Sequence, residues 1–185
     1  MFGLFKSKPL TNPRCAVVSI GGHDRDKLDL DKEIYCDFAN VTAIECSSVS
    51  ALAECLEHRP VDILHLLTEI GSDETIQGES KTAFLEQLSL LGPKILILAS
   101  DNDAQSLIAF CSKGPMLSLN LVMTLDRKGE AFANFFKKLF ILILGGRTMP
   151  DAWAHLSPQM PGENDLSMPG TIFSAGNGGL RIAEK

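Results

Sequence analysis

Three polar residues, Glu69, Ser100 and Asp101, directly follow two apolar runs of the chain and are the first candidates for chemistry. A serine hydroxyl can act as a nucleophile, but it needs a general base, because its free pKa leaves it inert near neutral pH. Two carboxylates side by side are a poor base, since each raises the pKa of the other. His65 and Thr68 lie on the run that precedes Glu69, so they are neighbours of the same candidate site.

The cysteine thiols are the other nucleophiles that the sequence offers. There are five of them: Cys15, Cys36, Cys46, Cys55 and Cys111. They show neither CxxC nor zinc-finger spacing, and most fall in apolar stretches, where cysteine packs as a small hydrophobic side chain. One alternative makes Cys46 or Cys111 a nucleophile. His23 or His65 would then be its base, and the thiol would need a lowered pKa and access to solvent.

Motifs for nucleotide, metal or serine-hydrolase chemistry are missing. Without GxGxxG or GxxxxGK[ST], the glycines at 21–22 are interpreted as a tight turn. The acidic stretch 24–33 lacks the register of an EF-hand loop and is interpreted as a solvated helix face. Neither HExxH nor GxSxG occurs. The sequence therefore predicts no cofactor and no metal.

Composition and charge narrow the class of protein. The chain has 185 residues, of which 45% are hydrophobic, as is usual for one globular domain. A net charge of −6 with scattered basic residues disfavours nucleic acid as a partner. The apolar run at 139–144 is too short to span a bilayer, and the start has no signal-peptide core. We expect a cytoplasmic protein without stable membrane insertion.

Apolar runs alternate with amphipathic segments along the chain. Strands are predicted at 15–20, 41–47, 61–67, 94–100 and 119–125, and helices at 27–38, 48–60, 81–92, 101–114, 129–146 and 150–156. Residues 171–182, with a GNGG turn, are predicted to form a C-terminal hairpin. The alternation predicts a single α/β domain at 14–185 after a flexible N-terminal segment at 1–13. We expect a three-layer sandwich, with a mostly parallel sheet between helices.

The carboxyl ends of parallel strands are where ligand or catalytic groups gather. Thr68-Glu69 and Ser100-Asp101 are predicted to lie at such ends. His65 lies within its strand and, by alternation, on a face under a helix, so we expect a hydrogen-bonded core histidine.

Several segments resemble the CHAT family of caspase-like domains. ILHLLTEIG, residues 63–71, resembles the family's strand ending in a His-x-x-Thr-His-Gly pattern, with His65 on the first, non-catalytic histidine and Thr68 on the threonine. Residues 94–100 resemble the family's strand before the catalytic cysteine. Residues 119–156 resemble its strand, its long Phe-bearing helix and the helix behind it, and residues 168–179 resemble its closing strand with the Gly turn. The resemblance spans about residues 60–180.

The departures from the family fall where catalysis would be. Caspase-like peptidases place the general-base His after one strand and the nucleophilic Cys after its neighbour. Glu69 stands at the base position, one residue too far from Gly71, and 99–101 reads Ala-Ser-Asp without a cysteine. The resemblance implies a catalytically inactive domain for protein–protein interaction or signalling, with a protein partner. A sheet edge could also support a homodimer. The alternative is a cysteine-peptidase-like hydrolase with an unconventional site.

Residues 51–67 also resemble the helix–strand step of response-regulator receiver domains, which have a flavodoxin-like fold. A working receiver needs an acidic pair after its first strand, an Asp after the third and a Lys after the fifth. This chain has glycines at 21–22, Leu-Thr at 67–68 and no matching Lys, and only Ser100 fits a receiver position. A degenerate receiver-type signalling domain is therefore the second alternative.

Overall fold

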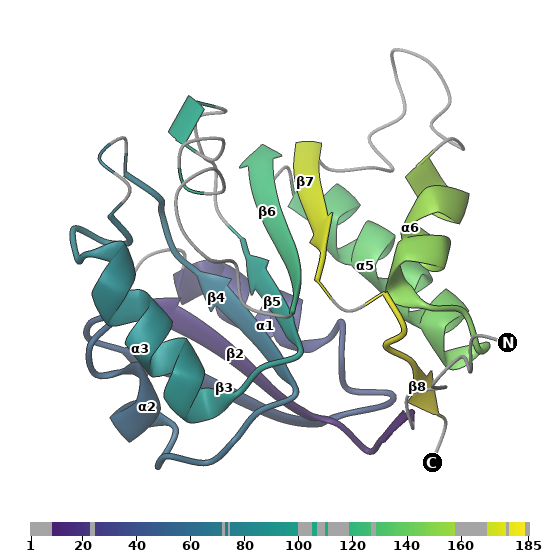
Figure 1. The fold of residues 1–185 in the computed structure, drawn as a ribbon, viewed down its shortest axis with the longest axis horizontal. Coiled ribbons are helices and arrows are strands. Elements are labelled where there is room, and N and C mark those ends of the chain that lie inside the picture. Colours follow the sequence, from purple (N-terminus) through teal and green to yellow (C-terminus); the bar gives the residue numbers. More distant parts are fainter. Residues whose placement is uncertain are drawn as a thin grey trace, which may run out of the picture.

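The computed structural model describes residues 9–22, 25–71, 73, 75–99, 105–106, 110, 119–126, 129–157, 170–176 and 178–183. Its centre is a six-stranded sheet in the order β3-β2-β4-β5-β6-β7 (Figure 1). The strands are β2 (Arg14–Ile20), β3 (Asn40–Cys46), β4 (Ile63–Leu67), β5 (Ile95–Leu98), β6 (Asn120–Asp126) and β7 (Gly170–Ala175). All neighbours pair in parallel except β7, which is antiparallel to β6. The predicted α/β fold with a mostly parallel sheet is confirmed.

Helices cover both faces of this sheet and complete three layers (Figure 1). One face packs against α1 (Leu28–Lys32), α5 (Gly129–Leu144) and α6 (Met149–Leu156), and the other against α2 (Leu52–Cys55) and α3 (Lys81–Leu91). Successive side chains of a strand point to opposite faces, so Val17 enters the first core and Val18 the second. The central strands are apolar on both faces for this reason, as their sequences indicate.

The helices differ in how closely they follow the sequence pattern. α3 begins after Ser80, whose hydroxyl accepts a hydrogen bond from the Ala83 N–H, and ends at Gly92 with φ 62°. The helices predicted at 27–38 and 48–60 are much shorter, and η1 (Arg25–Lys27) is a separate 3₁₀ turn. α2 ends early because Glu57 and His58 adopt positive φ values of 51° and 54°. Of the helix predicted at 101–114, only residues 105, 106 and 110 are described, and all three are helical.

The predicted C-terminal hairpin is wrong. β8 (Ile182–Ala183) pairs in parallel with β1 (Leu10–Thr11) in a separate two-stranded sheet, and not with β7. Leu180 and Ile182 are buried in the core beside α5. Because their side chains pack there, the chain after β7 runs toward β1 and does not pair with β7. β1 also corrects the N-terminal boundary, because residues 10–13 belong to the fold and not to a flexible segment.

In the part of the chain that the structure describes, no helix has both the length and the apolar character needed to cross a bilayer. The four phenylalanines of α5 are all buried in the core: Phe132, Phe135, Phe136 and Phe140. This helix face is therefore part of the interior.

Candidate functional site

The carboxyl ends of β4 and β5 hold the residues predicted from the sequence, and the two strands are direct neighbours. Thr68 is fully buried after β4, whereas Glu69 is exposed to solvent. Ala99 follows β5, and its N–H donates a 2.7 Å hydrogen bond to the Leu66 carbonyl oxygen. Ser100 and Asp101 lie outside the described residues, as do His23 and Cys111.

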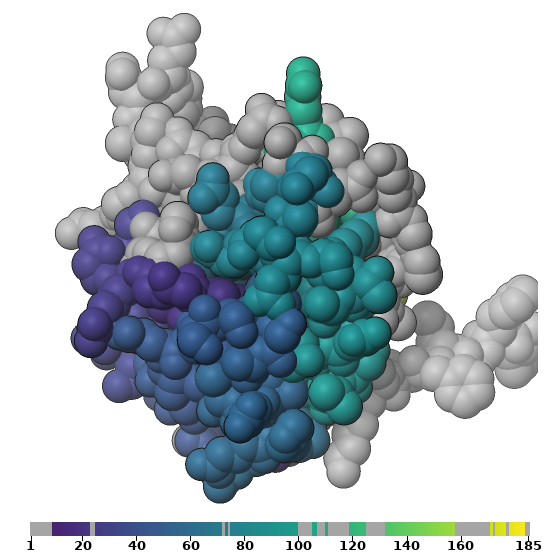
Figure 2. All heavy atoms as spheres, turned by 90° about the vertical axis from the view of Figure 1, so that its left-hand side faces the viewer, coloured from purple at the N-terminus to yellow at the C-terminus, as the bar shows by residue number. Residues whose placement is uncertain are grey.

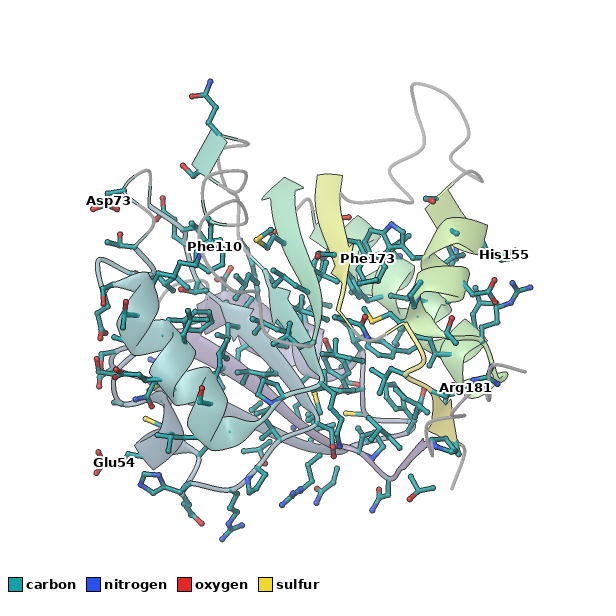
Figure 3. The ribbon with its side chains drawn as sticks, viewed as in Figure 1. Glu54, Asp73, Phe110, His155, Phe173 and Arg181 are labelled. Atoms are coloured by element: carbon teal, nitrogen blue, oxygen red, sulfur yellow. The ribbon has the colours of Figure 1, made fainter. Side chains whose placement is uncertain are left out.

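The described residues at these two strand ends provide neither a thiol nor an imidazole. The loop after β4 folds on itself, with the Gln77 N–H donating to the Glu69 carbonyl oxygen at 3.2 Å. Figure 3 shows Asp73 at the outer end of this loop. The Thr68 hydroxyl is buried without a hydrogen-bond partner. Such a group costs free energy, so this strand end carries a polar atom that the fold does not satisfy.

His65, in the middle of β4, has a fully buried side chain between the sheet and the segment that contains α1. Its Nδ1 lies 2.6 Å from the Tyr35 hydroxyl oxygen. Its Nε2 lies 3.0 Å from Oδ2 of Asp31, at ion-pair distance but without the alignment of a hydrogen bond. The rings of Tyr35 and Phe132 meet the imidazole edge to face, each with centroids 5.7 Å away. The prediction of a hydrogen-bonded core histidine is confirmed.

Sequence reasoning did not identify Asp31 and Tyr35 as the partners of this histidine. Both are fully buried. Their spacing of four residues places them on one face of a helical turn. This spacing, and the fact that Tyr35 is the single tyrosine of the chain, were the signals by which the sequence could have pointed to them. Burial, followed by the charges of Cys15 and Asp31, raises the pKa of Tyr35 well above its ordinary value. The Tyr35 hydroxyl therefore stays protonated.

The Asp31–Tyr35–His65 cluster has no access to solvent, so a substrate cannot reach the imidazole while the helical layer stays in place. All three side chains are at 0% exposure. Buried polar contacts specify how layers pack, and here the Tyr35–His65 contact joins the α1 segment to β4. The geometry is that of a structural polar cluster.

The alternative pairing of Cys46 with His65 is wrong, because the sheet separates the two side chains. Cys46 packs in the core formed with α2 and α3, whereas His65 contacts Tyr35 and Phe132 on the opposite face. Burial and a hydrogen bond with Cys55 raise the pKa of the Cys46 thiol to about 11. A cysteine that begins peptidase chemistry on a carbonyl needs a lowered pKa, so Cys46 does not have the character of a peptidase nucleophile.

Among the residues placed in the structure, no three His, Cys, Asp or Glu side chains come together as metal ligands. The chain matches none of the models of known protein families and none of the curated protein sequences. The fold defines an α/β protein with a mostly parallel sheet, and fold alone does not determine function.

Proposed function

We propose that the chain is a catalytically inactive caspase-like domain that acts by binding a protein partner in interaction or signalling. The observation that carries this proposal is the state of β4: the residue after its buried end is an exposed carboxylate, Glu69, and its one histidine, His65, is enclosed. A peptidase of this class needs an accessible imidazole near a nucleophile. The described ends of β4 and β5 offer neither.

The order of the strands supports the caspase-like part of the proposal. Because β4 and β5 are neighbours, Glu69 and Ala99 follow adjacent strands, as the base and the residues before the nucleophile do in that class. The five parallel strands have the order 2-1-3-4-5 when counted from β2, which flavodoxin-like receivers share. The antiparallel sixth strand, β7, favours the caspase-like family, whose closing strand this segment resembles.

β7 is the sheet edge that best suits the addition of a partner strand. Its sequence, GTIFSA, contains no charged residue and no proline. The opposite edge, β3, carries Glu45 in an ion pair with Arg25, and charges on an edge strand discourage pairing with another chain. No described strand pairs with the outer side of β7.

The backbone of β7 is held firmly from its inner side. The Gly176 N–H donates to the Leu119 carbonyl oxygen at 2.9 Å, so alternation turns the amides of Phe173 and Ala175 outward. The Phe173 ring stacks on Trp153 of α6 with centroids 4.9 Å apart. A strand fixed in this way loses little entropy when its outer side is paired. We take a second copy of the chain as the first partner to test.

The test compares two lysine substitutions by sedimentation equilibrium. Ala175→Lys places a charge on β7, and Thr42→Lys places the same charge on an exposed position of β3. A dimer formed through β7 should dissociate in Ala175→Lys and persist in Thr42→Lys, with unchanged circular dichroism in both. A wild-type protein that stays monomeric at every soluble concentration would refute the second copy as partner.

The inactive part of the proposal has a separate test. Iodoacetamide labelling of the five cysteines, read by mass spectrometry across a pH series, measures whether any thiol is activated. We expect every thiol to label slowly or to titrate near the free-cysteine value of roughly 8.5. One thiol that labels fast at about pH 6 would instead support the hydrolase alternative and locate its nucleophile.

A further inference from the structure

Two cysteine thiols meet where β3 ends and α2 ends. The Sγ atoms of Cys46 and Cys55 lie 2.7 Å apart, and both residues are free cysteines. A disulfide bond is about 2.05 Å long, so the two sulfur atoms need to move by less than about 1 Å to form one. The two side chains therefore meet close to the distance of that bond.

The two thiols differ in access. Cys46 is 2% exposed, whereas Cys55 is half-buried and lines a pocket of about 200 Å³. The surface that contains residues 40–60 lies beside that of α3 on one side of the molecule (Figure 2). A small molecule from solvent therefore reaches Cys55 first, and Cys46 only through Cys55.

The pocket that Cys55 lines also has cationic side chains in its wall. Arg14 and Arg59 both line it, together with the carboxylate of Glu57. Glu57 forms an ion pair with Arg59, so the charged lining carries one net positive charge. Guanidinium groups bind carboxylates well, which favours a ligand with negative charge.

The backbone beside Cys55 is held in a strained conformation. Glu57 and His58 have φ values of 51° and 54°, a region that residues with side chains rarely adopt. The N–H groups of these two residues bond back to Glu54 and Ala53 of α2, which keeps the turn in place. Strained residues of this kind cluster at functional sites, and Glu57 lines the pocket.

We propose that Cys46 and Cys55 are a redox-active thiol pair that reduces a small disulfide bearing carboxylate groups, bound in the pocket of Arg14 and Arg59. In the first step, Cys55 Sγ attacks one sulfur of the small disulfide. The disulfide bond of the ligand breaks, and its first thiol leaves with the proton that Cys55 gives up. The product is a mixed disulfide on Cys55.

In the second step, Cys46 Sγ attacks the sulfur of Cys55. The mixed disulfide breaks, the Cys46–Cys55 bond forms, and the second thiol leaves with the proton from Cys46. The protein loses two hydrogens and the ligand becomes two thiols.

The experiment incubates the reduced full chain with glutathione disulfide under anaerobic conditions and maps the products by mass spectrometry. We expect wild-type protein to lose two hydrogens, with the new bond between the peptides of Cys46 and Cys55. Cys46→Ala should stop at a mixed disulfide on Cys55, and Cys55→Ala should leave Cys46 unmodified. Cys36→Ala is the matched control, because Cys36 is an exposed thiol elsewhere, and it should react as wild type does.

The pocket has its own test. Arg14→Met and Arg59→Met should each slow the reaction with glutathione disulfide about threefold, because each removes one of the positive charges that attract an anionic ligand to the pocket. Cystamine, a disulfide with positive charges, should react faster with these variants than with wild type. Equal rates for both probes in all proteins would overturn the anionic ligand.

The thiol pair itself is overturned if wild-type protein takes up glutathione at Cys36 while Cys46 and Cys55 stay reduced. This measurement needs no variant, so a substitution that impairs folding does not affect it. The sedimentation experiment on the proposed function is independent of the result, because pairing through β7 does not involve Cys46 or Cys55.

Discussion

Replacing the single tyrosine tests whether the buried polar cluster stabilises the fold. Tyr35→Phe removes one oxygen atom, which lies 2.6 Å from Nδ1 of His65. The ring itself stays and keeps its contacts with Phe38 and Phe140, whose centroids lie 6.1 and 5.3 Å away. The change therefore isolates the hydroxyl, because the apolar packing is the same before and after.

The expected loss follows from the burial of the partner left behind. His65 is at 0% exposure, so water cannot replace the hydroxyl. A buried group that loses its hydrogen-bond partner costs about 1–3 kcal/mol. With a urea m-value of about 2 kcal/mol/M for a small protein, a loss of about 2 kcal/mol lowers the unfolding midpoint by about 1 M.

Urea unfolding followed by circular dichroism measures this shift, provided that the m-value does not change. Thr68→Val is the matched control, because its hydroxyl is also fully buried but has no hydrogen-bond partner. Removing that hydroxyl should leave stability unchanged or raise it by about 1 kcal/mol. A Tyr35→Phe loss below about 0.5 kcal/mol, the size of an ordinary surface change, would refute the reasoning.

The ionisation of Tyr35 at alkaline pH gives a second test of its burial. Burial, with the charges of Cys15 and Asp31, raises the pKa of Tyr35 above its unfolded value of about 10. The folded state thus holds this proton more tightly, and its stabilising effect is complete below about pH 10 and is lost as the pH rises further. Because Tyr35 is the single tyrosine, phenolate absorbance should appear only as the protein unfolds. Phenolate formation in the folded protein at about pH 10 would contradict this.

Three further substitutions test other parts of the fold. Gly176→Ala should cost about 2–4 kcal/mol, because a Cβ there would lie 2.1 Å from the Leu119 carbonyl oxygen. An unchanged melting temperature would show that β7 can shift away from β6. His58→Gly should stabilise by about 0.5–1 kcal/mol in urea unfolding, since glycine adopts its φ of 54° without strain, and a loss would contradict the strained turn. Burial alone would raise the pKa of Asp62, but hydrogen bonds from Lys94 and a backbone amide, with nearby positive charge, lower it below its usual value. The stability that the Asp62 carboxylate contributes is present above about pH 4 and is lost as the pH falls through the lowered pKa. Asp62→Asn should therefore lower the free energy of unfolding by about 0.5–1 kcal/mol at neutral pH and by little in acid, as urea unfolding at the two pH values would measure.

The sequence alone determined those strands and helices whose start and end depend on residues within the same segment. The run at 94–100 contains β5 because it is apolar at consecutive positions, which only a strand covered on both faces requires. α3 lies where it was predicted because Ser80 and Gly92 satisfy its two ends within the helix's own segment. The sequence also shows directly that residues 99–101 contain no cysteine.

Contacts between distant segments were decided only by the tertiary structure. Tyr35 and His65 are 30 residues apart and meet because β3, β2 and β4 place the α1 segment over β4. The thiols of Cys46 and Cys55 meet because α2, which ends at Cys55, packs against β3, which ends at Cys46. The hairpin prediction failed for the same reason. Turn residues set local chain direction, but the burial of Leu180 beside α5 set where β8 pairs.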